Sequence, residues 1–124
     1  MRKQTYMAAV DATVERWRHD RLGESLTCQT FDAGVPAHCH ANAAAYVTSH
    51  EGEVVHGFLV LHPQDWTEVM VMAHSVVRTA TGLVDVSLSL SQLQGHAFFP
   101  LLCDVDDFVE QAQRFPEQRR SIVL

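Results

Sequence analysis

The chain has 124 residues, of which 47% are hydrophobic and 19% charged, a composition that excludes a disordered chain. Its net charge of −6 with neutral histidines argues against a nucleic-acid binder, because phosphate contacts need clustered Lys and Arg. No apolar run approaches the roughly 20 residues of a membrane span. Asp11 and Glu15 are unlike a secretion signal, and three cysteines suggest no disulfide framework. We therefore expect a single domain over residues 1–124, cytoplasmic, with no nucleic-acid or membrane partner.

The first half of the chain predicts two helices separated by a short strand and a loop. Apolar side chains recur at helical spacing within residues 4–21, and residues 39–50 show the same periodicity. Between them, residues 25–31 favour a strand and residues 32–37 a loop with Gly and Pro. The side chains expected to face the core are Tyr6, Val10, Val14 and Trp17, then Ala43, Tyr46, Val47 and His50.

Three strands are predicted next. Residues 53–62 and 69–79 are apolar on both faces, which is typical of central strands. A short turn containing Gly then leads into a strand at residues 83–89, so the last two strands are expected to form a hairpin.

The C-terminal part predicts a loop and a helix. The loop covers residues 92–100, and the helix runs from Asp104, its expected N-cap, to Phe115. Its inward side chains are expected to be Val105, Phe108, Val109, Ala112 and Phe115. The order of elements predicts an α+β fold with a small, mostly antiparallel sheet packed against helices.

Cys39 is the first residue that suggests chemistry. It opens the second predicted helix, where the positive end of the helix dipole favours the thiolate. His38 and His40 flank it and would stabilise the thiolate further if protonated. The alternative is a buried structural cysteine, since free cysteine is among the most buried residue types.

His74 and Asp85 lie on the two arms of the predicted hairpin, each in an otherwise apolar strand. If Arg78 pairs with Leu83, the two side chains are diagonal neighbours on one face. A loop starting one residue earlier places them directly opposite, and an odd-numbered loop separates them. Burying either alone is costly, so we expect a contact. A nucleophilic cysteine needs such a base and orienting group, although a purely structural His–Asp bond is the alternative.

These residues carry a family resemblance across roughly residues 34–90. The succession of Cys39 opening a helix, "EVVHGFLV" with Gly57, and "AHSVVRTATGLVDVS" is similar to the transglutaminase-like core, a branch of the papain-like cysteine-enzyme fold. The resemblance implies Cys39 as nucleophile, His74 as general base and acid, and Asp85 as the group that orients it. It also implies thioester chemistry, by hydrolysis, deamidation or acyl transfer, on a protein, peptide or small amide substrate.

An enzyme of this kind needs donors for the oxyanion of the reaction. The backbone N–H of Cys39, at a helix start, is one natural donor. The side-chain amides of Gln29, on an upstream strand, and Asn42, one helical turn beyond Cys39, are candidates for a second. His40 is a further candidate for a residue that lines the substrate site.

Two other functions stay open. One is a non-catalytic interaction or inhibitor module on the same fold. The other is a zinc protein built on His38, Cys39 and His40, although neighbouring residues splay too widely to share one metal. We expect no metal or other cofactor. His56 is expected to be a hydrogen-bonded core histidine, and His96 could line a cleft.

Overall fold

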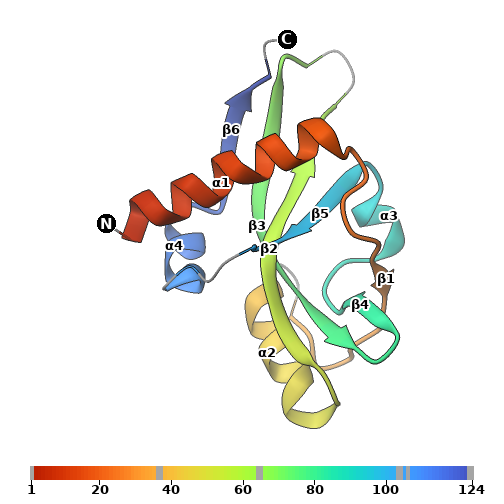
Figure 1. Ribbon diagram of the computed structural model, residues 1–124. Coiled ribbons are helices and arrows are strands. Elements are labelled where there is room, and N and C mark those ends of the chain that lie inside the picture. Colours follow the sequence, from red (N-terminus) through yellow and green to blue (C-terminus); the bar gives the residue numbers. More distant parts are fainter. Residues whose placement is uncertain (1, 36–37, 64–65, 103–104, 106, 123–124) are drawn as a thin grey trace.

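Helices and strands alternate along the chain in a computed structural model that describes residues 2–35, 38–63, 66–102, 105 and 107–122 (Figure 1). The helices are α1 (Arg2–His19), α2 (Cys39–Ser49), α3 (Leu90–Leu93) and α4 (Phe108–Arg114). The strands are β1 (Thr27–Cys28), β2 (Glu53–Leu61), β3 (Glu68–Thr79), β4 (Gly82–Asp85), β5 (His96–Pro100) and β6 (Glu117–Ser121). No helix in these ranges is long and apolar enough to cross a lipid bilayer.

The strands form one mixed sheet in the order β1-β4-β3-β2-β5, with β6 also paired to β3. Only the short β1–β4 pair is parallel among the pairs in this order, and β6 is antiparallel to β3. The predicted α+β class with a mostly antiparallel sheet is therefore confirmed. The two apolar strands predicted to be central, β2 and β3, each have neighbours on both edges.

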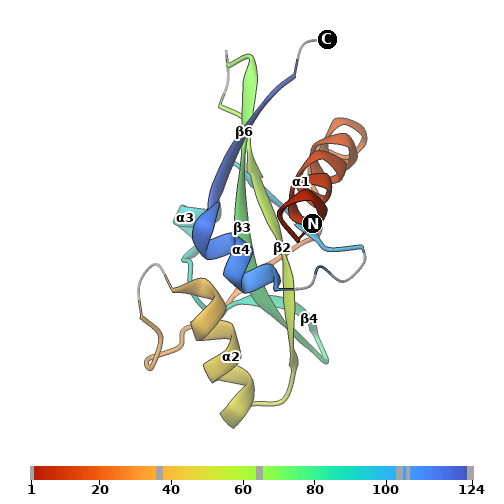
Figure 2. The same cartoon turned by 90° about the vertical axis from the view of Figure 1, so that its left-hand side faces the viewer.

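Both faces of the sheet are covered. Helices α1 and α4 pack on one face, and α2 packs further along it against Val77 and Val84 (Figure 1). In Figure 2, α1 and α3 lie to either side of the strands. The main cluster includes Tyr6, Val10, Val14, Trp17, Phe58, Val60, Val69, Val71, Phe99 and Phe108. The cluster on the opposite face includes Leu59, Val76, Leu83, Leu93 and Phe98.

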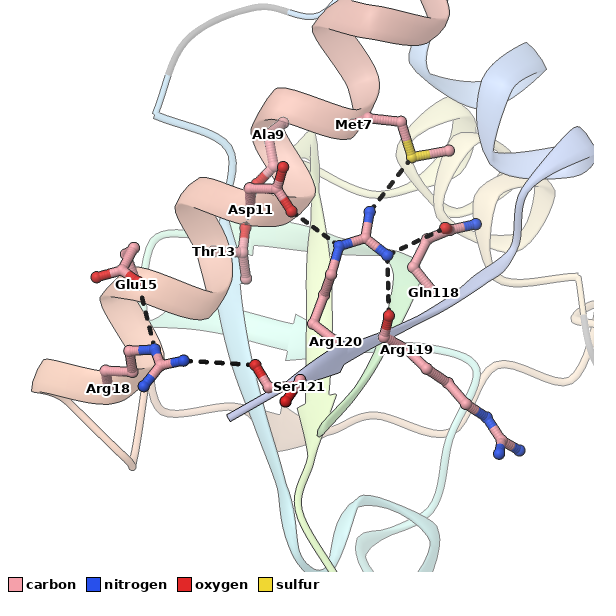
Figure 3. Close-up of polar contacts among 10 residues, drawn as sticks. All are labelled: Met7, Ala9, Asp11, Thr13, Glu15, Arg18, Gln118, Arg119, Arg120 and Ser121. Atoms are coloured by element: carbon pink, nitrogen blue, oxygen red, sulfur yellow. Dashed lines mark hydrogen bonds and ion pairs between the residues drawn. The ribbon is translucent and has the colours of Figure 1, made fainter. Parts of the chain in front are cut away.

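Strand β6 was not predicted from the sequence, because its residues Glu117–Ser121 carry no apolar alternation. Backbone pairing with β3 holds it in place, and polar contacts join it to α1 (Figure 3). Arg120 Nε lies 2.8 Å from Asp11 Oδ1, and Arg18 Nη2 donates to Ser121 O at 3.4 Å. A polar edge strand of this kind is stabilised by main-chain bonds and charge pairs rather than by burial.

The prediction of a loop over residues 92–100 is wrong. Helix α3 begins before it, and β5 follows as a strand paired with β2. The reason lies in three buried residues, Ala97, Phe98 and Phe99, which alternate between the two hydrophobic clusters on opposite faces of the sheet.

The last helix is shorter than predicted. α4 begins at Phe108. Its N-cap residue, Asp107, has a left-handed backbone (φ 56°), and its side chain makes no capping hydrogen bond. Asp104, the predicted N-cap, lies outside the described residues. The helix still presents Phe108 and Ala112 to the core, as its periodicity indicated.

The hairpin has the first of the registers considered, with Arg78 paired to Leu83, and the turn is tightened by a Thr79–Gly82 pair. Strand β4 ends at Asp85 instead of continuing to residue 89. The cause is local: Asp85 Oδ1 accepts hydrogen bonds from the backbone N–H groups of Ser87 and Leu88, both at 2.8 Å. Such an Asx-type turn competes with the strand ladder.

Candidate active site

His74 and Asp85 form a buried pair on the face of the sheet opposite α1. His74 Nε2 lies 2.5 Å from Asp85 Oδ2, and the two residues are 3% and 0% exposed. The diagonal neighbourhood follows directly from the hairpin register. Because Nε2 is bound to the carboxylate, Nδ1 is the ring nitrogen left for another partner.

Asp85 is held as a carboxylate by four features. Burial alone would raise its pKa, but the hydrogen bond and charge of His74 outweigh burial, and the N–H groups of Leu88 and Ser87 add to them. The pKa of Asp85 is therefore lowered. A carboxylate fixed in this way stabilises a protonated imidazole beside it.

Cys39 is the first residue of α2 and is half-buried. Burial of the thiol would raise its pKa, but hydrogen bonds with His40 and His74 and the charges of both rings outweigh burial. Together they lower the pKa of Cys39 to about 6. The side chain of the N-cap residue, His38, makes no capping hydrogen bond, so the amides of the first turn are not capped by that side chain.

The pKa of His74 moves the other way. Burial alone would lower it, but the hydrogen bonds and charges of Asp85 and Cys39 raise the pKa of His74 to about 9. At neutral pH the three side chains are therefore a thiolate, an imidazolium and a carboxylate.

His74 and Ser75 lie on β3 between two strand ladders. On one edge of β3, β6 pairs with its N-terminal part and β4 with its C-terminal end, and His74 and Ser75 lie between. Consecutive strand residues point to opposite faces, so His74 and Ser75 face different sides of the sheet. Cys39 interacts with His74, and also with His40, which contacts Ser75. The thiol thus bridges side chains from the two faces.

The side chain of Asn42 joins two loops by hydrogen bonds. It is 4% exposed; its Oδ1 accepts from Val35 N at 2.8 Å, and its Nδ2 donates to Val35 O at 2.8 Å and to Ser87 Oγ at 3.0 Å. These bonds tie the segment before Cys39 to the turn after Asp85. Both N–H groups and the oxygen of this amide are engaged in hydrogen bonds, so its contacts are those of a positioning residue.

Gln29 acts through its backbone. Its N–H donates to Asp85 O at 2.9 Å, beside the pairing of Cys28 with Asp85, and so helps to fix β4. Its side chain is exposed, and Nε2 donates to Thr30 O at 3.5 Å. The contacts described for Gln29 are thus with β4 and its own neighbour.

His40 follows Cys39 directly in α2, and its ring helps to lower the pKa of the thiol. Its Nδ1 lies 2.5 Å from Ser75 Oγ. Ser75 also lies 2.7 Å from His56 Nδ1. Sequence reasoning did not single out Ser75, although a serine directly after His74 in an apolar strand was a signal. The prediction that His56 is hydrogen-bonded is confirmed, but the residue is half-buried and not fully in the core.

The other candidates lie apart from this cluster. His38 is exposed, and Cys103 is outside the described residues. Among the side chains that the structure describes, no group of three or more His, Cys, Asp or Glu is arranged to hold a metal ion. The zinc hypothesis stays a prediction. His96 lines a cavity of about 770 Å³ together with Phe98, whose ring centroid is 6.1 Å from that of His74.

Comparison of the chain with protein-family models, with curated proteins and with solved structures finds no match. The chemistry of the site therefore has to be argued from its own residues.

Proposed function

We propose that this protein is a small cysteine-dependent hydrolase or acyl-transfer enzyme in which Cys39 is the nucleophile. The observation that carries the proposal is the buried His74–Asp85 pair, which interacts with the thiol at the start of α2 and lowers the pKa of that thiol. His74 is the general acid and base, and Asp85 orients it. The same order and spacing support the resemblance to transglutaminase-like, papain-like enzymes.

The reaction follows from these charges. The Cys39 thiolate attacks the carbonyl carbon of an amide or ester, and the carbonyl oxygen takes up the negative charge. His74 then gives its proton to the leaving amine or alcohol as the bond to carbon breaks, which leaves a thioester. Water or an amine attacks this thioester, gives its proton to a histidine, and releases the thiolate.

The first turn of α2 supplies the oxyanion donor in this scheme. The first N–H groups of a helix have no partner within the helix, and Cys39 N–H is one of them. The contacts of Asn42 with Val35 and Ser87 favour a positioning role for that amide.

The substrate class in this proposal is a protein, peptide or small amide. A reducing, cytoplasmic setting accords with the two described cysteines, Cys28 and Cys39, which are both free thiols. We propose no cofactor, because the acid, the base and the nucleophile are all side chains of the chain itself.

The experiment is acyl-enzyme trapping with p-nitrophenyl acetate, an activated ester that needs no specificity pocket. The protein is quenched in acid, digested and mapped by mass spectrometry, with Cys39→Ala as the control. An acetyl group on Cys39, together with ester turnover that Cys39→Ala loses, supports the proposal. Equal turnover by the wild-type and Cys39→Ala proteins, with no acetyl group on Cys39, contradicts it and favours a non-catalytic module.

A further inference from the structure

Ser75 lies between two histidine rings on the α2 side of the sheet. Its Oγ is 2.5 Å from His40 Nδ1 and 2.7 Å from His56 Nδ1, and the residue is 0% exposed. A serine hydroxyl donates one hydrogen bond, so it donates to one ring while accepting an N–H from the other. The three side chains form a chain, His40–Ser75–His56.

Phe108 of α4 fixes the two rings from another side. It stacks on His56 with ring centroids 4.9 Å apart and an interplanar angle of 20°. It meets His40 edge-on, at 5.8 Å and 81°. A ring held by one hydrogen bond and one aromatic contact has little freedom to rotate.

The direction of the hydrogen bonds follows from the environment of His56. Burial, and then the charge of His40, lower the pKa of His56, so its ring is neutral at neutral pH. With the His40 ring charged, both of its nitrogens carry protons, so Nδ1–H donates to Ser75 Oγ, and Ser75 donates its hydroxyl proton to Nδ1 of the neutral His56. The Nε2–H of His40 is then left to donate to the Cys39 thiolate.

We propose that His40 is a second histidine partner of the Cys39 thiolate, oriented by Ser75 and His56 in the way that Asp85 orients His74. This inference rests on the proposed function, because it concerns the same nucleophile. His40 contacts the reacting sulfur and is a catalytic residue in this account. Ser75 and His56 are positioning residues.

The titratable groups around the thiol come from one helix and three strands. His40 belongs to α2 and His74 to β3, and His56 of β2 and Asp85 of β4 stand behind them. α4 contributes Phe108, which does not titrate. The thiolate is therefore stabilised from two sides, and loss of His74 leaves one stabilising histidine in place.

The test is the pH dependence of iodoacetamide alkylation of Cys39, read by peptide mass spectrometry. The proteins compared are the wild type, His40→Gln, Ser75→Ala and His74→Gln. His50→Gln is the matched control, because His50 lies at the other end of α2 and stacks on Tyr46. Thermal melting of each variant checks that it is folded. If Ser75→Ala does not fold, the His40→Gln variant alone decides the test, because His40 is only half-buried.

The expected result is an upward shift of the alkylation midpoint by about one pH unit in His40→Gln and in Ser75→Ala, since the first removes the His40 imidazole and the second removes the hydroxyl that orients it. His50→Gln leaves the midpoint unchanged, and His74→Gln keeps it below that of Cys28. The inference is overturned if His40→Gln leaves the midpoint unchanged and His74→Gln alone removes the whole shift. That outcome leaves the proposed function standing, whereas an ordinary midpoint in the wild type overturns both.

Discussion

His74 and Asp85 are diagonal neighbours on two antiparallel strands, and 2.5 Å separates His74 Nε2 from Asp85 Oδ2. The pair is buried, and His74 also interacts with a half-buried thiol at a helix start. This relationship connects a hairpin register to the charge state of a cysteine.

Replacing Asp85 with Asn removes the carboxylate and keeps its shape. The unpaired histidine loses its stabilising charge, so the pKa of His74 falls and the wrong tautomer is favoured. We expect activity to drop by about 100-fold or more. Stability should fall by about 3–5 kcal/mol, the usual effect of removing one partner of a buried pair. Ester turnover and urea unfolding measure the two effects; an active, fully stable variant would contradict the pairing.

The pH–rate profile should be bell-shaped. The thiol loses its proton as pH rises through about 6, and the imidazolium of His74 loses its proton as pH rises through about 9. The reactive ion pair exists between these values, so kcat/KM for ester hydrolysis rises through the first and falls through the second. In Asp85→Asn the falling limb moves to lower pH. A single limb that rises near the pKa of an ordinary thiol is incompatible with this account.

Asn42→Ala should weaken the fold without changing the thiol. Three hydrogen bonds from a buried amide are lost, so the free energy of unfolding falls by about 1–3 kcal/mol. The alkylation midpoint of Cys39 is expected to stay unchanged. Thr48→Ala, at an exposed position of α2, is the control. A rate loss of about 100-fold or more in acylation at unchanged stability would instead identify Asn42 as an oxyanion donor.

Gly57→Ala tests the pairing of β2 with β5, a strand that lies where the sequence predicted a loop. A Cβ at Gly57 would lie 2.4 Å from Phe99 O and 2.8 Å from Pro100 Cα, so β5 must move away from β2. Because Gly57 also pairs with His74, the strain acts next to the site. We expect a loss of about 1–3 kcal/mol in unfolding free energy. Gly34→Ala, whose Cβ would meet Phe31 O at 3.1 Å, is the milder control, and equal losses would contradict the β2–β5 pairing.

The elements that the sequence predicted are those with a repeating apolar pattern. Tyr6, Val10, Val14 and Trp17 are buried along α1 as their spacing indicated, and Arg78 pairs with Leu83 as one of the registers considered requires. A contact between two polar residues in apolar strands was predicted for the same reason: neither is stable when buried alone.

The features that were missed depend on tertiary contacts. β6 is polar and is held by β3 and α1, and β5 follows a Gly-containing turn that suggested a loop. The His40–Ser75–His56 chain joins three elements and has no local pattern. Local spacing also gave no reason for the ring of His40 to meet the thiol, since that depends on how α2 sits on β3.

The central claim is that Cys39 is a thiolate at neutral pH, and competitive alkylation within one molecule measures it. Exposed Cys28 is the internal reference, because burial and Asp85 raise its pKa while that of Cys39 is lowered to about 6. At about pH 6 roughly half of the Cys39 thiol is ionised, whereas on the order of 0.1% of an ordinary thiol is ionised at that pH. Even after about a twentyfold discount for the weaker nucleophilicity of a low-pKa thiolate, Cys39 should react roughly twentyfold faster.

Limiting iodoacetamide over a range of pH, followed by peptide mapping of Cys28, Cys39 and Cys103, gives the rates and midpoints directly. The account predicts a midpoint for Cys39 at about pH 6, well below that of Cys28. A midpoint for Cys39 equal to that of Cys28, with no preference at about pH 6, would contradict it.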